Sequence, residues 1–89
     1  MRYATTEDLK GRYQKVYCKA TDGNYYPLKD YYPIAMNVAD KPNLVYLDTG
    51  GPMGPCDFFI AKIEDGKLLR QDILSREFRV VSQEVIVKE

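Results

Sequence analysis

Tyrosine and lysine side chains alternate along a segment near the start of the chain. In residues 13–20 (YQKVYCKA), every second position is aromatic or basic, which is typical of a β-strand that presents these side chains on one face. Tyrosine rings can stack on bases, and lysine ammonium groups can hold phosphates or carboxylates. Together with a tyrosine from the return strand, the pattern predicts a contact surface made of Tyr13, Lys15, Tyr17, Lys19 and Tyr26.

The overall charge limits which ligands this surface would take. The chain has 13 basic and 13 acidic residues and a formal net charge of zero. A balanced chain exerts no long-range attraction on polyanions, so nucleic acid and anionic membranes are disfavoured as partners. A small anionic ligand or an acidic protein surface remains compatible with the surface, whose pattern is also that of a plain solvated strand.

A glycine-rich segment from Thr49 to Pro55 offers a second candidate surface. Its three glycines would let backbone N–H groups approach a phosphate, but it lacks the Lys-Ser/Thr ending of a phosphate-binding P-loop. Its composition is typical of a connecting loop. We therefore expect a loop that contributes Gly50, Gly51 and Met53 to contacts with a partner.

Reactive groups are scarce. The chain has no histidine, which removes the Ser-His and Cys-His pairs that activate nucleophiles. Its two cysteines, Cys18 and Cys56, are far apart and have no basic cluster beside them, so we interpret them as reduced structural thiols. Too few ligands remain for a zinc site. The composition predicts no enzyme, no catalytic residue, no metal and no cofactor.

Asp48 is a candidate catalytic carboxylate. The segment Leu47-Asp48-Thr49-Gly50 resembles the motif of retroviral-type aspartic proteases, small β-rich chains that dimerise so that two carboxylates share one proton. The motif lies late in this chain, and the Ile-Gly-Arg type segment of that family is missing. An ordinary Asx turn after a strand is the preferred interpretation.

Short elements are expected along the N-terminal half. Thr5–Lys10 is expected to form one helical turn that is capped by a threonine and ended by Gly11. The segment Ile34–Met36 is interpreted as a brief helix or an irregular packed loop. Asn43–Asp48 is a near-continuous apolar run and is expected to be a central strand.

A first hairpin is expected around Asp22-Gly23. This dipeptide is typical of a two-residue turn, which would place Tyr26 opposite Lys19. Pro27 donates no ladder hydrogen bond, so the return strand should be short and should lie at a sheet edge.

A second hairpin is expected around Asp65-Gly66. With this two-residue turn, Glu64 faces Lys67 across the ladder. One face of the hairpin then consists of Phe59, Ala61, Ile63 and Leu68, and the other includes Phe58, Ile60 and Leu69. Because both faces are apolar, we expect the hairpin to lie mid-sheet and to be covered on both sides.

These elements predict a single α+β domain spanning residues 1–89. Its core would be a small, mostly antiparallel β-sheet of five to six strands, open or curled into a partial barrel, with one or two short helices. The N-terminus has no apolar signal core, and no run of about 18 apolar residues occurs. We expect a cytoplasmic protein with no membrane contact.

The C-terminal third resembles a group of small proteins encoded by bacteriophages. These proteins share a Gly-Asp-aromatic-Ile strand, a glycine turn, a second short strand, an Asp-Ile/Pro-Phe turn and an aromatic-containing final strand. The counterparts here are Asp57-Phe58-Phe59-Ile60, Asp65-Gly66, Leu68-Leu69, Asp72-Ile73-Leu74 and Phe78, with Cys56 in place of the family's glycine. The resemblance implies a phage-like origin and a small β-sheet module.

The resemblance and the missing catalytic groups together favour a non-enzymatic binding protein. Small phage proteins of this kind commonly block a host protein, so we expect an inhibitor of a host defence protein, such as a CRISPR effector, in the host cytoplasm. One alternative is a virion structural or assembly component that pairs through strand edges. Another is a sponge for a small nucleotide signal, which calorimetry with cyclic nucleotides would test. A homodimer is left open.

Overall fold

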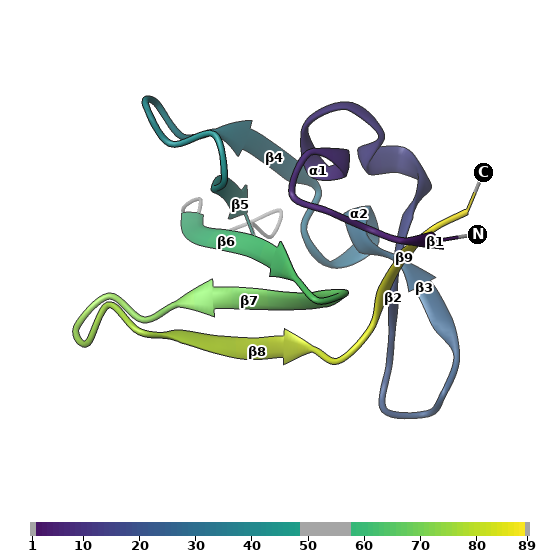
Figure 1. Cartoon of the computed structure of the whole chain (residues 1–89). Coiled ribbons are helices and arrows are strands. Elements are labelled where there is room, and N and C mark those ends of the chain that lie inside the picture. Colours follow the sequence, from purple (N-terminus) through teal and green to yellow (C-terminus); the bar gives the residue numbers. More distant parts are fainter. Residues whose placement is uncertain (1, 49–57, 89) are drawn as a thin grey trace, which may run out of the picture.

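The computed structural model describes residues 2–48 and 58–88 (Figure 1). The elements in chain order are β1 (Arg2–Tyr3), α1 (Asp8–Gly11), the 3-10 helix η1 (Tyr13–Lys15), β2 (Val16–Lys19), β3 (Tyr25–Pro27), α2 (Leu28–Tyr31), β4 (Ile34–Asn37), β5 (Val45–Asp48), β6 (Phe58–Glu64), β7 (Lys67–Gln71), β8 (Phe78–Ser82) and β9 (Val85–Val87). None of the helices in these ranges has the length and apolar content needed to cross a membrane.

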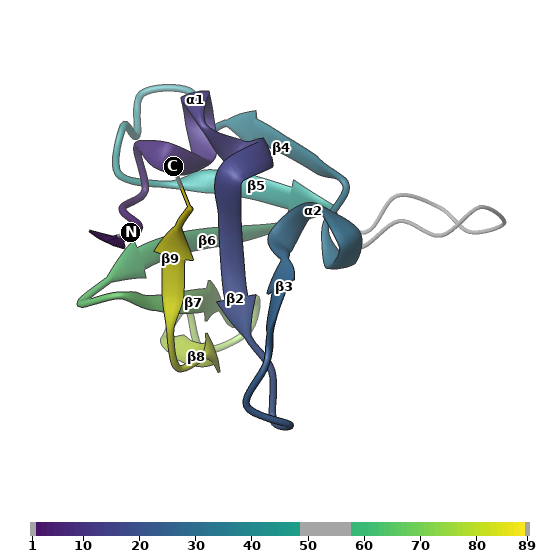
Figure 2. The ribbon, with the colours of Figure 1, turned by 90° about the vertical axis from the view of Figure 1, so that its right-hand side faces the viewer.

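The strands form two antiparallel sheets. One has four strands in the order β1-β9-β2-β3, and the other has five in the order β4-β5-β6-β7-β8. Figure 2 shows the strands of the smaller sheet running across those of the larger one. The small, mostly antiparallel fold with short helices is confirmed, but the prediction of one sheet is wrong. Each sheet keeps two edge strands, so the sheets do not close into a barrel.

The core lies between the two sheets. Val16, Val85 and Val87 from the smaller sheet and Leu47 and Leu68 from the larger one are at most 1% exposed. The helices close the space between the sheets with two further buried leucines, Leu9 and Leu28. Packing the two sheets against each other therefore buries one face of each, because an amphipathic sheet must cover its apolar side.

The second hairpin forms as the turn chemistry predicts. Ile63 pairs with Leu68 and Glu64 pairs with Lys67, while Asp65 and Gly66 adopt positive φ angles of 54° and 74°. Both strands lie inside the five-stranded sheet, which confirms the mid-sheet position. The expected cover on both sides is wrong: Phe58, on the side away from the core, is 39% exposed.

The first hairpin differs from its predicted form. Residues 13–15 form η1, so strand β2 begins only at Val16. The turn has three residues instead of two, with Ala20 N–H donating to the Asn24 carbonyl at 2.8 Å and Gly23 at a φ of 88°. This additional residue pairs Lys19 with Tyr25 and places Tyr26 opposite Cys18. The prediction that Tyr26 lies opposite Lys19 is therefore wrong by one residue, which moves Tyr26 to the other face.

The segment expected as a helix or loop around residues 34–36 is strand β4. It pairs with β5 over four residues, from Ile34 opposite Asp48 to Asn37 opposite Val45. The local sequence has no strong preference, so the ladder offered by β5 decides its conformation.

The first helix begins at an aspartate rather than at a threonine cap. Asp8 is buried, and its carboxylate accepts two hydrogen bonds from the Arg2 guanidinium, at 2.7 and 2.8 Å, and one from Thr5 N–H at 2.8 Å. The bond to Arg2 is the main cause that lowers the pKa of Asp8 from 3.8 to about 2. The carboxylate therefore ties strand β1 to the start of α1.

We expect Asp8→Asn to lower the free energy of unfolding at neutral pH by about 2 kcal/mol. Because the folded pKa lies below the unfolded one, the contribution of Asp8 is complete above about pH 4 and is lost as the pH falls towards 2. Urea unfolding at pH 7 and at lower pH measures the contribution of Asp8 to the free energy of unfolding. The wild-type protein should lose stability over that interval faster than the variant, and parallel pH profiles would contradict the role given to Asp8.

Candidate functional site

Three tyrosines and two lysines lie on the outer side of the four-stranded sheet. Tyr17 stands beside Ile86, and Lys19 stands opposite Tyr25. The Lys88 ammonium lies 4.5 Å from the ring centroid of Tyr17 and 5.9 Å from that of Tyr25, in cation–π geometry. We call this surface the tyrosine face; it consists of Tyr3, Tyr17, Lys19, Tyr25, Glu84, Ile86 and Lys88.

The tyrosine face brings together only part of the predicted surface. Tyr17 and Lys19 lie on it, whereas Tyr13 and Lys15 belong to η1. Tyr13 packs against the core, and its hydroxyl donates to the carbonyl of Tyr32. Tyr26 lies on the other side of the sheet, and its hydroxyl donates to Asp22 at 2.6 Å. The remaining predicted contacts, Gly50, Gly51 and Met53, lie outside the described residues.

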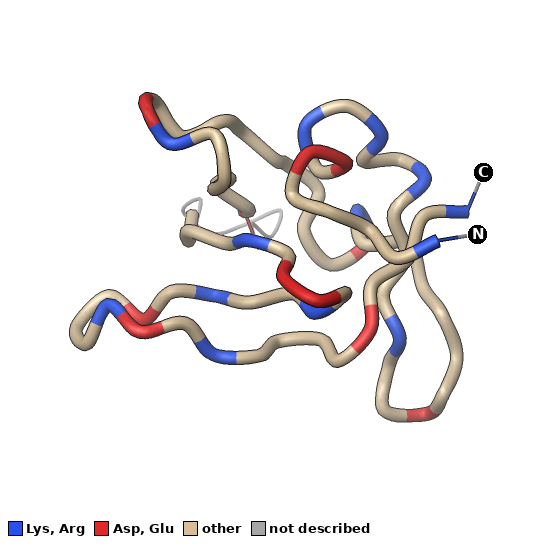
Figure 3. The backbone as a smooth tube through the Cα atoms, in the orientation of Figure 1, with Lys and Arg blue, Asp and Glu red and all other residues tan. Residues whose placement is uncertain are grey.

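Charges on the tyrosine face largely satisfy one another. Glu84 lies 3.8 Å from Lys19, and its hydrogen bond to Tyr25 raises the pKa of that tyrosine. Lys88 is the remaining cation and is exposed. Figure 3 shows further basic residues near both chain ends. The face could hold one anionic group, and an open hollow of about 320 Å³ adjoins it, lined by Arg2, Tyr3, Glu84 and Ile86.

A larger apolar surface covers the outer side of the five-stranded sheet. Strand pairing places its members on the face opposite the core. We call it the apolar face; its apolar side chains are Ile34, Met36, Tyr46, Phe58, Ile60, Leu69, Phe78 and Val80. Lys62 lies on the same side of the sheet, with its ammonium 4.3 Å from the ring centroid of Phe78. Four of the apolar side chains are between 39% and 46% exposed: Ile34, Met36, Phe58 and Val80. Large apolar side chains in one contiguous group on a surface mark an interaction site far more often than scattered ones do.

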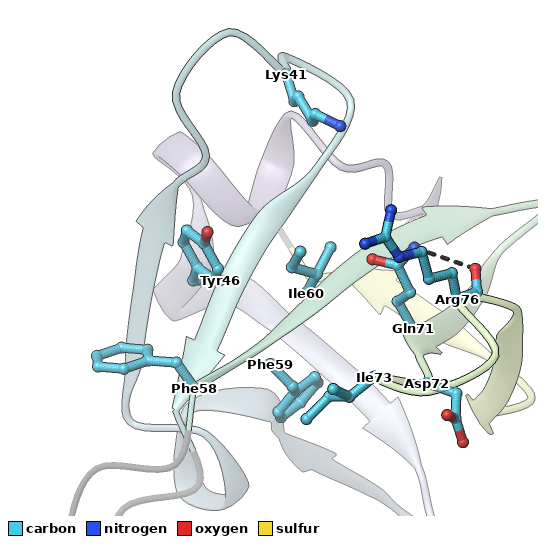
Figure 4. Close-up of a pocket in the computed structure, with 9 residues that line it drawn as sticks. All are labelled: Lys41, Tyr46, Phe58, Phe59, Ile60, Gln71, Asp72, Ile73 and Arg76. Atoms are coloured by element: carbon cyan, nitrogen blue, oxygen red, sulfur yellow. Dashed lines mark hydrogen bonds between the residues drawn. The ribbon is translucent and has the colours of Figure 1, made fainter.

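A groove of about 400 Å³ crosses this face beside the loop between β7 and β8 (Figure 4). Tyr46, Phe58 and Ile60 line it from the sheet, and the rings of Tyr46 and Phe58 meet edge to face with centroids 6.4 Å apart. Lys41 and Arg76 stand at its border. Gln71 and Asp72 also line the groove, so its wall combines aromatic and polar side chains, as protein-binding surfaces commonly do.

The loop beside the groove carries two exposed apolar side chains. Ile73 is 81% exposed and Leu74 is 94% exposed. The Asp72 carboxylate accepts hydrogen bonds from Leu74 N–H at 2.8 Å and Ser75 N–H at 3.1 Å, which lower its pKa. Asp72 therefore caps the turn that contains Ile73 and Leu74. The cap holds the pair Ile73-Leu74, which we call the loop tip, in a defined position next to the groove.

Comparison with protein-family models, curated proteins and solved structures finds no match to this chain. The choice between the two surfaces as the candidate binding site therefore depends on their own chemistry. The apolar face and the loop tip expose more large apolar side chains than the tyrosine face, so they are the stronger candidate site.

Reactive groups are few in the described part of the chain. Residues 2–48 and 58–88 contain no cluster of three or more His, Cys, Asp or Glu side chains that could hold a metal. Cys18 is buried, which raises the pKa of its thiol and keeps it protonated. Asp48, the carboxylate of the protease-like motif, ends β5 and is only 1% exposed.

The apolar face was not predicted, because both sides of the second hairpin were expected to be covered by other parts of the chain. The loop tip had a visible signal. Ile73 and Leu74 are two large apolar residues within a turn capped by Asp72, where a polar pair is the usual choice. Apolar side chains in so short a capped turn cannot reach the core of the protein, so the exposure of Ile73 and Leu74 was predictable.

Proposed function

We propose that this protein is a non-enzymatic binding protein that contacts a partner protein through the apolar face and the loop tip. The observation that carries the proposal is the exposure of several large apolar side chains on one side of the larger sheet and on the adjoining loop, including Leu74 at 94% and Phe58 at 39%. Water contact with such side chains is unfavourable by about 25 cal/mol per Å² of apolar surface, and a partner that covers them recovers this energy.

The partner we favour is a host protein, and the effect is inhibition of a host defence protein such as a CRISPR effector. The resemblance of the C-terminal third to small phage proteins supports this choice. The segment that carries the resemblance, β6 to β8, contributes most of the groove's lining and the whole loop tip, while Tyr46 of β5 and Lys41 complete the groove. A partner that inserts an aromatic or aliphatic side chain into the groove and rests on the tip would fit this geometry.

Affinity capture from infected and uninfected host cells tests the proposal. The wild-type protein should retain one host protein at a stable ratio. Phe58→Asp should lose that protein, because the charge would be buried against the partner. Val81→Asp is the matched control: Val81 is also 39% exposed, but it lies in a surface hollow with Lys19 of β2 and Thr21 of the turn that follows β2. Equal capture by both variants, or capture of nothing by the wild type, would contradict the proposal.

A further inference from the structure

The two sheets have four edge strands, β1, β3, β4 and β8, within the described part of the chain. An edge strand presents backbone N–H and C=O groups that can pair with another chain, so proteins normally protect such edges. Known protections are a very short strand, a charged residue, a proline or an irregular ladder. These features separate the protected edges from the edge that is open to pairing.

Three of the edges carry a protection. Strand β1 has two residues, one of which is Arg2. Strand β3 has three residues and ends in Pro27, which has no N–H to donate. Strand β8 contains Arg79, and its ladder with β7 is irregular between Leu68 and Leu69. These features make each of the three edges a poor template for another strand.

Strand β4 carries none of these protections, and helix α1 is the helix that contacts it most. The four residues of the strand, Ile34 to Asn37, include no charge and no proline, and its ladder with β5 is regular. Two of its side chains, Ile34 at 44% and Met36 at 46% exposed, belong to the apolar face. Figure 1 shows β4 at the end of the sheet, with β5 along one side only. The unprotected edge and the apolar face therefore meet at this strand.

We propose that β4 pairs antiparallel with β4 of a second copy of this chain, which joins the two five-stranded sheets into one. In an antiparallel ladder, facing residues share a face, so a two-fold axis through Ala35 places Ile34 of one copy opposite Met36 of the other. Both side chains then lie on the apolar face, which becomes continuous across the two copies. This two-fold contact is self-complementary, as a closed dimer requires.

The charge distribution favours a second copy as the occupant. The chain has a formal net charge of zero, so two copies do not repel each other at long range. The strand itself contributes no charge, so no like charges face each other within the two paired strands. The pairing requires neither a host partner nor the loop tip, and its test is therefore independent of the proposed function.

Sedimentation equilibrium of the purified protein alone tests the dimer. The average mass should rise from 10.3 kDa towards twice that value with increasing concentration. We expect a dissociation constant of about 10 µM, because a four-residue strand contact is smaller than a standard protein interface. A wild-type mass that stays at 10.3 kDa up to about 1 mM would overturn the proposal without any variant.

Three variants test the site and the register. Met36→Lys should weaken the dimer by at least about tenfold, because its ammonium would face Ile34 of the other copy. Val80→Lys introduces the same charge on the same face but on strand β8, at 43% exposure, and should dimerise like the wild type. The double variant Ile34→Glu with Met36→Lys should recover the dimer, since each glutamate then faces a lysine. Equal loss in Val80→Lys, or no recovery in the double variant, would contradict β4 pairing in this register.

Discussion

A variant with Ile73→Ser and Leu74→Ser should bind the captured partner at least about 100-fold more weakly than the wild type, because burying each side chain fully contributes about 1.5–3 kcal/mol. Both residues are almost fully exposed in the free protein, at 81% and 94%. They contribute little to folding, so the melting temperature should not change. Binding and stability are therefore expected to separate completely at this loop.

Calorimetric titration of the purified pair and a thermal melt of the variant measure the two quantities. Val81→Ser is a control for the loss of an exposed apolar side chain away from the loop tip. Asp72→Ala gives a second comparison, because it keeps both apolar side chains but removes the acceptor of Leu74 and Ser75 N–H. We expect an intermediate loss of affinity from the looser loop. Unchanged affinity in the double serine variant would remove the loop tip from the interface.

Leu47→Ala should lower the free energy of unfolding by about 3–4 kcal/mol, the usual cost of a large-to-small change in a well-packed core. Leu47 is 0% exposed, and it lies between Ala35 of β4 and Phe59 of β6 on the buried side of the larger sheet. A small domain has a total stability of only roughly 5–10 kcal/mol, so this change should remove a large part of it.

Urea unfolding of the wild type and the variant measures this loss. Leu74→Ala is the matched control, since it makes the same chemical change at a side chain that is 94% exposed. It should change the free energy of unfolding by less than about 0.5 kcal/mol. Similar losses in the two variants would mean that Leu47 is not part of a packed core, and would contradict the two-sheet arrangement.

Local chemistry was sufficient to predict the second hairpin. Asp65 and Gly66 adopt the positive φ angles that a two-residue turn requires, and the turn then determines that Glu64 faces Lys67. The cap at Asp72 and the edge position of the strand containing Pro27 were also predictable. Each of these features depends on residues within a few positions of one another in the chain.

Two of the five residues of the predicted tyrosine and lysine surface were also within reach of the sequence. Tyr17 and Lys19 share a face because they are two residues apart in one strand. Tyr26 was assigned to the wrong face because one additional turn residue reverses every side chain after it. Lys88 joins the face through pairing between β9 and β2, which are distant in the chain, so no local pattern could indicate it.

The sequence by itself determined the strand-rich composition, the tight second hairpin and the lack of histidine, because these follow from residue types and near neighbours. Only the tertiary structure decided that the strands divide into two sheets, that Ile34–Asn37 forms an edge strand, and that Phe58 faces outwards. An apolar strand with two apolar faces does not specify which face is covered. That depends on which distant segments pack against it, and the face left open here is the one proposed to bind a partner.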